Sequence, residues 1–446
     1  MAVKITGITA RDIRFPTSLE GDGSDAIHTD PDYSCAYITL TTSTEAKGFG
    51  HTFTIGRGTE IVCEAAHALG EFVVGKHLQE ITADFAGFWR ALANDSQLRW
   101  LGPEKGVVHL ATCAIVNAVW DLWAKVERKP LWKLLADMTP EELVSVIDFR
   151  YISDLLTREE ALEILKKGQD GKKEREAELI SKGYPAYITS AGWSGYDEQK
   201  TRQKCKEALA KGFVRFKAKV GTGIEADRRR LAVMREEIGY DKLLMTDANQ
   251  RWDVSEAIDW MKQLTEFKPL WIEEPTSPDD VLGHATIAKA LKPYNIAVAT
   301  GEHCQNRVVF KQLFQADSIA YCQIDGCRLG GVNEVLAVLL MAAKLNVPVC
   351  PHAGGVGLCQ VNQHFSYFDY ICVSRTLENR FLEYAEHLHE NYKFPVEVKG
   401  GHYVLPQIPG FQTEMREASL DTHEYPIGPV WQKLFAEGTF KPPKKH

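Results

Sequence analysis

The chain has 446 residues, a quarter of them charged, and a formal net charge of −8 at neutral pH. This length is enough for two or three domains, or for one large barrel with a satellite domain. The acidic balance argues against nucleic acid as the main partner, because no basic stripe is present to neutralise phosphates. No unbroken run of about 18 apolar residues stands out, so we expect no contact with a membrane.

The ten cysteines are scattered without a CxxC pair, and several lie in apolar, strand-like runs. We interpret them as reduced and buried, which is typical of an intracellular protein. The N-terminal segment MAVKITGITARDIRF alternates like a β-strand and lacks the apolar core of a signal peptide. We therefore expect an intracellular location without a clear targeting peptide.

Residues 1–145 are predicted to form an N-terminal α+β capping domain. Strand-like runs at 3–14 and 36–42 flank a polar loop over about 18–34, rich in Gly, Asp and Ser. Loops of this length without structure of their own are typically lids or binding loops. Helical patterns follow, and in the one at 107–127 the small residues Ala111, Ala114 and Ala118 recur at helical spacing, which predicts close packing.

Residues 146–390 alternate short apolar runs with amphipathic helical patterns. Eight strands joined by crossovers of this size predict an α/β fold with a parallel (β/α)₈, or TIM-type, barrel. An open doubly wound sheet is the competing arrangement, but it would need a phosphate-binding glycine loop after an early strand. Residues 391–446 lose the alternation and are predicted to fold back toward the capping domain. The eight strands are predicted at 145–151, 214–220, 243–249, 269–275, 296–302, 319–325, 347–354 and 370–378.

Three acidic residues, Asp247, Glu273 and Glu302, end three successive predicted strands. Catalytic groups in such barrels lie at the C-terminal ends of the strands, and neighbouring strand ends are close in space. Three converging carboxylates are usually neutralised by a hard cation with oxygen ligands. We therefore predict one Mg²⁺ per chain at this position, although any one of these acids alone would fit a helix N-cap or a solvated loop equally well.

Lys217 and Lys219 are two positions apart on one predicted strand, so their side chains point to the same face. Two ammonium groups facing into a barrel beside a metal repel each other, which lowers the pKa of at least one and suits a general base. On the far side, His352 follows the seventh strand and Asp325 ends the sixth. A carboxylate bound to one ring nitrogen fixes the tautomer and raises the basicity of the other.

Bases on both sides of a metal suit removal of the weakly acidic proton α to a carboxylate, because a cation stabilises the enediolate as charge develops. Reprotonation would give epimerisation, and loss of a β-hydroxyl as water would give dehydration. The residues alone leave both outcomes open. Glu383, just past the eighth predicted strand, is equally compatible with a structural and a functional role.

The KAK pair, the three-acid set and the Asp325–His352 pair resemble the mandelate-racemase-like branch of the enolase superfamily. The longer motifs FPTSLEGDGSDAIHTDPDYS, RWLGPEKGVVHLAT, WIEEPTSPDD and CPHAGGVGLC are similar to the L-fuconate dehydratase family within it. The resemblance implies a hydro-lyase of carbohydrate metabolism that dehydrates L-fuconate to 2-keto-3-deoxy-L-fuconate. It also implies a small-molecule sugar acid as partner, a homo-oligomer, and either a mitochondrial or a cytoplasmic location.

The same resemblance assigns roles to individual residues. It makes Lys219 the base at C2, Lys217 its modulator and a contact of the substrate carboxylate, and His352 the acid oriented by Asp325. The lid departs from one form of the family, which has alanine where this chain has Ser24. The implied substrate contacts are Gly23, Ser24, Asp25, Tyr33, Lys217, Asn249, Glu302, His352, Ala353, Gly354 and Glu383.

Two alternatives remain at this stage. One is a dehydratase for another acid sugar, of the arabinonate or galactonate type, with the same barrel residues and a different lid. The other is a catalytically idle scaffold on an enolase-like fold, which the intact set of base, acid and ligands argues against.

Overall fold

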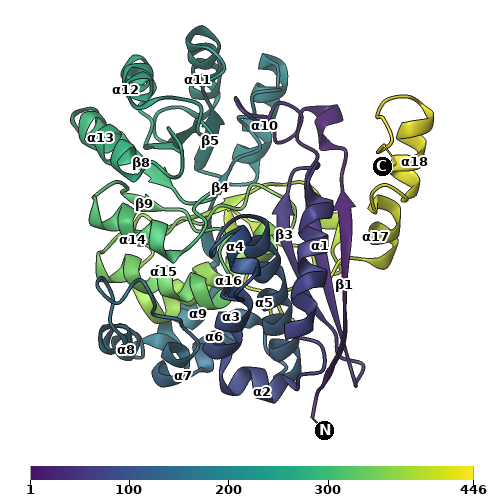
Figure 1. Cartoon of the computed structure of the whole chain (residues 1–446). Coiled ribbons are helices and arrows are strands. Elements are labelled where there is room, and N and C mark those ends of the chain that lie inside the picture. The colour runs from purple at the N-terminus through teal and green to yellow at the C-terminus, as the bar shows by residue number, and fades with distance from the viewer. Residues whose placement is uncertain (1, 445–446) are drawn as a thin grey trace.

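The computed structural model of the chain describes residues 2–444, which form a capping unit, a barrel and a C-terminal segment (Figure 1). The capping unit begins with a three-stranded antiparallel sheet in the order β1-β2-β3, made of β1 (Ile5–Arg14), β2 (Ser34–Thr42) and β3 (Gly48–Thr54). Its helices are α1 (Thr59–Leu69), α2 (Leu78–Ala83), α3 (Phe85–Ala93), α4 (Leu98–Leu101), α5 (Gly106–Val126), α6 (Leu131–Asp137) and α7 (Pro140–Ser145).

Strand β3 is absent from the sequence-based prediction, and two of its glycines explain why. A Cβ atom on Gly48 would lie 2.2 Å from the carbonyl oxygen of Ala118, and one on Gly50 would lie 2.1 Å from that of Ala114. Helix α5 therefore crosses the sheet so closely that only glycine fits beneath it. The close packing predicted from the alanines is confirmed, and the glycines that permit it weaken the strand pattern.

Helix α5 corrects the expectation about apolar runs. By length and composition it could cross a membrane, and 78% of its most apolar 18-residue window is buried inside the protein. Asn117 and Asp121 interrupt its apolar residues. Its apolar side chains pack in the core, where the ring of Trp120 stacks on Phe85 with centroids 4.7 Å apart.

A mostly parallel sheet closes the barrel. Strands β4 to β9 pair in chain order, and β10 pairs with β4 from the other side. The gap between β9 and β10 is filled by the chain around Val349, which forms a parallel bridge with Cys322, and the Glu383 amide then donates to the Pro351 carbonyl (3.4 Å). The predicted α/β barrel with an N-terminal cap is thereby confirmed. Its strands are β4 (Tyr184–Ile188), β5 (Arg215–Lys219), β6 (Leu243–Asp247), β7 (Trp271–Glu273), β8 (Ala297–Thr300), β9 (Tyr321–Cys322) and β10 (Leu382–Tyr384).

The barrel helices lie around the outside of this sheet (Figure 1). Helices α8 (Arg158–Lys167) and α9 (Lys172–Lys182) precede the first strand. The helices that follow successive strands are α10 (Glu198–Ala210), α11 (Ile224–Ile238), α12 (Val254–Gln263), α13 (Val281–Leu291), α14 (Arg307–Gln315), α15 (Val332–Lys344) and α16 (Leu358–Phe368).

Two predicted strands, the first and the eighth, were wrong. Ser145 ends α7, residues 146–151 form turns and irregular chain, and the first barrel strand is β4. Residues 369–374 form a π-helix that continues α16, and the eighth strand is β10. A short apolar run does not distinguish a buried strand from a buried helix, and the apolar parts of both runs, 146–149 and 370–373, are buried.

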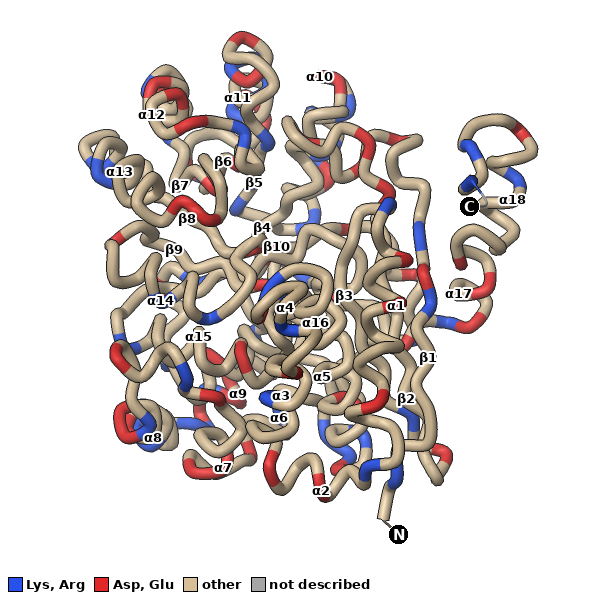
Figure 2. The backbone as a smooth tube through the Cα atoms, in the orientation of Figure 1, with Lys and Arg blue, Asp and Glu red and all other residues tan. Residues whose placement is uncertain are grey.

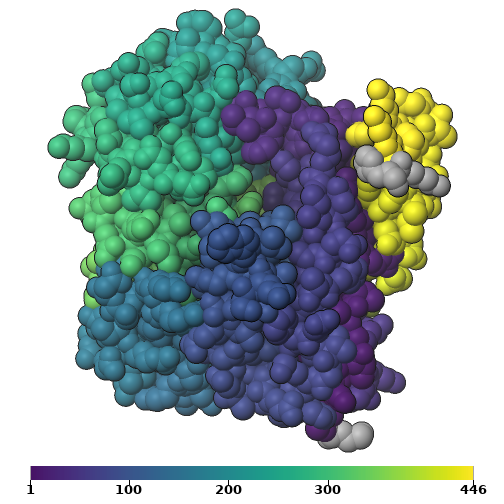
Figure 3. Space-filling model, in the orientation of Figure 1, coloured from purple at the N-terminus to yellow at the C-terminus, as the bar shows by residue number. Residues whose placement is uncertain are grey.

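The C-terminal segment returns to the cap. Strands β11 (Val398–Lys399) and β12 (His402–Tyr403) extend the sheet beside β4, and α17 (Glu417–His423) and α18 (Pro429–Ala436) lie along β1 (Figures 1 and 3). Arg11 of β1 forms an ion pair with Glu417 (2.7 Å), and the Trp431 indole donates to the Arg14 carbonyl (3.0 Å). Figure 3 shows the end of the chain, with α17 and α18, on the outer side of the cap.

All ten cysteines are buried and none forms a disulfide, as predicted. Burial raises the pKa of the Cys350 thiol to about 12, so it stays protonated at neutral pH. The cysteines therefore act as small apolar side chains.

Candidate active site

The three predicted metal ligands converge at the C-terminal end of the barrel strands. Asp247 ends β6 and lies opposite Glu273, the last residue of β7, while Glu302 follows β8 by two positions. One carboxylate oxygen from each of the three lies within 4.8 Å of the others, and all three residues are buried. Figure 2 marks the acidic residues at the ends of β7 and β8, inside the ring of outer helices.

The chemistry of these carboxylates fits a divalent cation. Burial, together with the neighbouring negative charges, raises the pKa of Glu273 well above its ordinary value and raises that of Glu302. One buried oxygen of Glu302 also has no hydrogen-bond partner. A hard ion that takes oxygen ligands, such as Mg²⁺, would satisfy both the excess charge and this oxygen.

Both lysines of β5 face these carboxylates. The Lys217 Nζ lies 2.6 Å from Glu273 and 3.3 Å from Asp247. The Lys219 Nζ lies 2.5 Å from Asp247 and donates to the Asn249 side-chain oxygen at 2.8 Å. The strand register sets this arrangement, because Lys219 and Asp247 are directly paired across β5 and β6.

The lowered lysine pKa expected from the sequence is not found. Burial lowers the pKa of Lys219, but the negative charge of Asp247 outweighs it and the net shift is upward. The pKa of Lys217 is raised as well, because Glu273 and Glu383 outweigh burial. The repulsion between the two lysines, on which the expectation rested, is outweighed by the carboxylates that pair with them.

His352 and Asp325 form the predicted pair on the opposite side. The His352 Nδ1 lies 3.0 Å from Asp325, and the other ring nitrogen lies 3.6 Å from Glu302. Burial lowers the pKa of His352, yet Glu302 and Asp325 outweigh burial and raise it to about 10. The ring is thereby held as a proton donor at neutral pH, with Nε2 on the cavity side.

Glu383 lies within the eighth strand rather than beyond it. Its carboxylate accepts a hydrogen bond from the Ala353 amide (2.8 Å) and pairs with Lys217 (2.7 Å). Burial raises its pKa, but Lys217 and His352 outweigh burial and lower it to about 2. Glu383 thus connects the lysine side of the site to the segment that holds His352.

A cavity of about 100 Å³ lies between these groups and the lid. Four of the predicted substrate contacts do not line it: Ser24, Lys217, Ala353 and Glu383. The last three are buried beneath the cavity-lining residues. The Ser24 hydroxyl donates to the Gly21 carbonyl (2.7 Å) and accepts from the Gly195 amide (2.8 Å), so it fastens the lid. The predicted residues that do line the cavity are Gly23, Asp25, Tyr33, Lys219, Asn249, Glu302, Asp325, His352 and Gly354.

The lid is held down over the barrel by a small set of polar contacts. Asp22 accepts a hydrogen bond from the Tyr196 hydroxyl (2.6 Å) and pairs with His387 (3.2 Å). Gly23 adopts a positive φ of 76°, and a Cβ there would lie 2.4 Å from the ring of Tyr33. Only glycine therefore allows the lid to pass this closely over the tyrosine.

Sequence reasoning missed five polar residues at the cavity, namely Thr54 of β3 and four ionisable ones. His28 of the lid binds Asp25 (2.9 Å), and its ring stacks on His303 with centroids 6.2 Å apart. Both histidines and Arg328 line the cavity, and the fourth ionisable residue, Glu274, binds His303 at 2.8 Å. The available signals were the second acid of WIEEP and the histidine of TGEH, each next to a predicted ligand.

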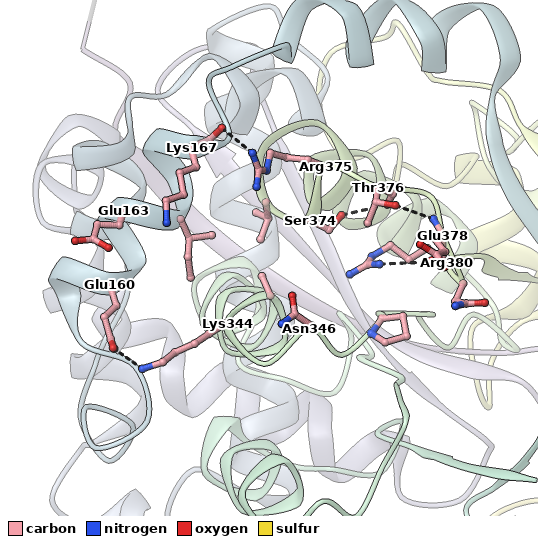
Figure 4. Close-up of a pocket in the computed structure, with 15 residues that line it drawn as sticks. Glu160, Glu163, Lys167, Lys344, Asn346, Ser374, Arg375, Thr376, Glu378 and Arg380 are labelled. Carbon is pink, nitrogen blue, oxygen red and sulfur yellow. Dashed lines mark hydrogen bonds and ion pairs between the residues drawn. The ribbon is translucent and has the colours of Figure 1, made fainter.

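A second cleft, of about 640 Å³, lies at the opposite end of the barrel between α8, α15 and the π-helix (Figure 4). Two of its basic residues already pair within the protein: Lys344 with Glu160 at 2.5 Å, and the Arg375 guanidinium with the Lys167 carbonyl at 3.5 Å. Its size exceeds that of the first cavity, but the convergent carboxylates, lysines and histidine lie at the other end. We therefore place the active site there.

Two family profiles match the chain. One, the mandelate racemase/muconate lactonizing enzyme N-terminal domain, covers residues 17–136, and the other, described as enolase C-terminal domain-like, covers residues 200–419.

The chain is similar to human mitochondrial enolase superfamily member 1, with 60% identity over 97% of this chain and 98% of that protein. The crystal structure of the human protein superposes with a TM-score of 0.96 over 97% of this chain and 99% of that one. L-galactonate dehydratase of Hypocrea jecorina is 56% identical over 95% of this chain and 94% of that protein. The structure of Salmonella typhimurium LT2 L-talarate/galactarate dehydratase, liganded with Mg and L-lyxarohydroxamate, shares the fold at 21% identity, with a TM-score of 0.72 and coverage of 94% and 92%.

Proposed function

The chain belongs to the enolase superfamily, and from this membership we propose that it is a Mg²⁺-dependent hydro-lyase that converts L-fuconate to 2-keto-3-deoxy-L-fuconate. The observation that carries the proposal is the placement of Lys219 and His352 on the walls of one cavity, beside the Asp247, Glu273 and Glu302 carboxylates. Dehydration next to a carboxylate needs a base at C2, an acid at the departing oxygen and a cation for the carboxylate.

On the base side, Lys219 removes the proton at C2. The amine must be neutral for this, whereas the carboxylates of the protein alone raise its pKa. Mg²⁺ held by Asp247, Glu273 and Glu302 would supply positive charge there, which favours the neutral amine and stabilises the charge that develops on the substrate carboxylate. Asn249 orients the amine through its side-chain oxygen.

On the acid side, His352 donates the Nε2 proton to the 3-hydroxyl as it leaves. The Asp325 carboxylate accepts from Nδ1–H and keeps the ring protonated and oriented. Glu383 fixes the backbone next to the histidine through the Ala353 amide. This assignment favours dehydration over epimerisation, since a donor held in its charged form is suited to an oxygen leaving group.

L-galactonate is the second candidate substrate. It is favoured by the 56% identity to the Hypocrea jecorina enzyme named for that acid. The two acids differ only at C6, so the barrel residues treat them alike.

The test is a panel of acid sugars incubated with the purified protein and Mg²⁺, with detection of 2-keto-3-deoxy products. We expect turnover to be fastest with L-fuconate and to be lost on chelation of the metal. Lys219→Ala should remove it, and undiminished turnover in that variant would contradict the assigned base. Turnover of L-galactonate alone would replace the proposed substrate and leave the reaction class.

A further inference from the structure

The cavity has two walls of different chemistry. The inner wall, formed by barrel residues such as Lys219, Glu302 and His352, is charged. The cap contributes polar residues of the lid and also the apolar side chains of Pro31, Phe53 and Ile55, which we call the outer wall. Pro31 lies on the lid, Phe53 on β3, and Ile55 directly after β3, where it is 36% exposed at the mouth of the cavity.

The outer wall offers hydrocarbon rather than hydrogen bonds. The neighbouring Thr54 hydroxyl is bound to the Thr59 hydroxyl (2.8 Å), and Thr59 in turn donates to the Gly56 carbonyl (2.6 Å). The Pro31 carbonyl accepts from the Thr17 hydroxyl at 2.9 Å. The Thr54 hydroxyl and the Pro31 carbonyl are thus already paired within the protein.

Phe53 holds the outer wall at a fixed place relative to the acid. A Cβ on Gly355 would lie 2.5 Å from the Phe53 ring, so the ring rests directly on the backbone that follows His352. The Tyr33 ring meets it edge-on from the other side, with centroids 5.2 Å apart. Because the ring is clamped in this way, the distance between the acid and the apolar surface changes little from one substrate to the next.

We propose that the outer wall receives the C6 group of the substrate and selects a methyl group at that position. The inference rests on the proposed function. That function places the carboxylate at the Asp247–Glu273–Glu302 cluster and C2 and C3 between Lys219 and His352. The remaining carbons then extend toward the cap, and the terminal one meets Pro31, Phe53 and Ile55.

Three acids differ only in what they present there. D-arabinonate carries hydrogen, L-fuconate a methyl group and L-galactonate a hydroxymethyl group, on the same configuration at C2 to C4. An apolar wall gains from burying the methyl group, whereas it removes water from the hydroxyl of L-galactonate without replacing the hydrogen bond. Apolar pockets discriminate modestly, so we expect kcat/KM for L-fuconate to exceed that for each of the others by roughly 10-fold.

The experiment compares Ile55→Thr with Ile55→Val across the three acids. Threonine and valine have the same shape, so the pair isolates the effect of a hydroxyl on the outer wall. We expect the L-galactonate to L-fuconate ratio of kcat/KM to rise several-fold in Ile55→Thr relative to Ile55→Val, with D-arabinonate changed equally in both. Ile27→Thr serves as a surface control, because Ile27 is on the lid, lies outside the cavity and is 45% exposed.

The outcomes separate the inference from the function beneath it. The proposal that the outer wall selects the C6 group would be wrong if the L-galactonate to L-fuconate ratio of kcat/KM were equal in the two Ile55 variants. It would also be wrong if the unaltered protein had equal kcat/KM for all three acids. In both cases the dehydratase function would stand. Absence of a 2-keto-3-deoxy product from all three acids would overturn the proposed function and the inference together.

Discussion

The strand ends of the barrel and the lid contribute to one cavity but are built in opposite ways. At the strand ends, Lys217 is almost fully buried and contacts three carboxylates, and Lys219 is clamped between Asp247 and Asn249. The lid, over about 18–34, is held mainly by the contacts of Asp22 and Ser24 with two barrel loops. The first region is interlocked, whereas the second is fastened at a few points.

Under the proposed function, this difference would separate the type of reaction from the choice of substrate. A charge network in which each member depends on the others tolerates little change, so it suits the proton transfers common to a whole superfamily. A segment fastened at a few points can change its cavity-facing residues without disturbing that network. The variants below test this division, from the largest expected effect to the smallest.

Lys219→Ala tests whether the strand ends carry the reaction. Removal of the base is expected to lower kcat by about 10²- to 10⁴-fold, the usual contribution of a positioned proton acceptor. The measurement is product formation from L-fuconate, with circular dichroism to verify folding. Lys211→Ala, which removes an exposed lysine paired with Glu386, is the control and should keep full activity. If kcat fell by less than about threefold in Lys219→Ala, the strand ends would not carry the reaction as proposed.

His352→Asn tests whether base and acid act separately. Dehydration should fall by about 10²-fold or more, because no donor remains for the departing hydroxyl. Lys219 is untouched, so the C2 proton should still exchange with deuterium in D₂O, as followed by NMR of recovered substrate. Loss of exchange together with dehydration would mean that His352 supports the lysine side as well, and the two halves would have to be treated as one unit.

The sequence predicted the convergence of the three acidic residues better than the outline of the barrel. The positions of Asp247, Glu273 and Glu302 were predicted correctly because parallel strands joined by helices bring successive C-terminal strand ends to one rim, and this rule survives small errors in strand bounds. The first and eighth strands were misplaced because apolar burial alone does not separate strand from helix. That error left Glu383 outside the strand that in fact positions it.

The pKa of Lys219 and the polar neighbours of the cavity could not be predicted, for a different reason. Both depend on contacts between segments far apart in sequence, such as Asp247 against Lys219 and His28 of the lid against His303. A sequence pattern identifies residue types and their spacing. It does not show whether burial or a neighbouring carboxylate has the larger effect on a lysine, and that balance decides whether the pKa of Lys219 rises or falls.

Glu334→Gln tests whether the body of the cap is as firmly fixed as the strand ends. Glu334 of α15 is buried and binds His109 of the cap (2.7 Å) and Arg307 (3.0 Å). Loss of its charge leaves Arg307 without one of its two nearest anions, so we expect about 3 kcal/mol less stability in urea unfolding at pH 7.

The pKa of Glu334 determines how the stability difference between the two proteins changes with pH. Burial raises the pKa of Glu334, but His109 and Arg307 outweigh burial and lower it from 4.5 to about 2. A depressed carboxyl pKa stabilises the fold above pH 4.5, and this contribution is lost as pH falls from 4.5 toward 2. The gap between the unaltered protein and the variant should therefore narrow from pH 5 to pH 3. A gap that stays constant over that range would contradict a charged Glu334 as its source.

Asp22→Asn tests the fastening of the lid and should have the smallest effect. Asparagine can still accept from the Tyr196 hydroxyl but loses the charge that pairs with His387, so kcat/KM should fall by roughly fivefold. Asp22 does not line the cavity, so the order of preference among acid sugars should stay unchanged. Asp30→Asn is the matched control, because Asp30 lies on the same lid and makes only a long, exposed pair with Arg57 (3.6 Å). A hundredfold loss in Asp22→Asn would place this contact within the interlocked region, and a changed order of acids would mean that the fastening of the lid also selects the substrate.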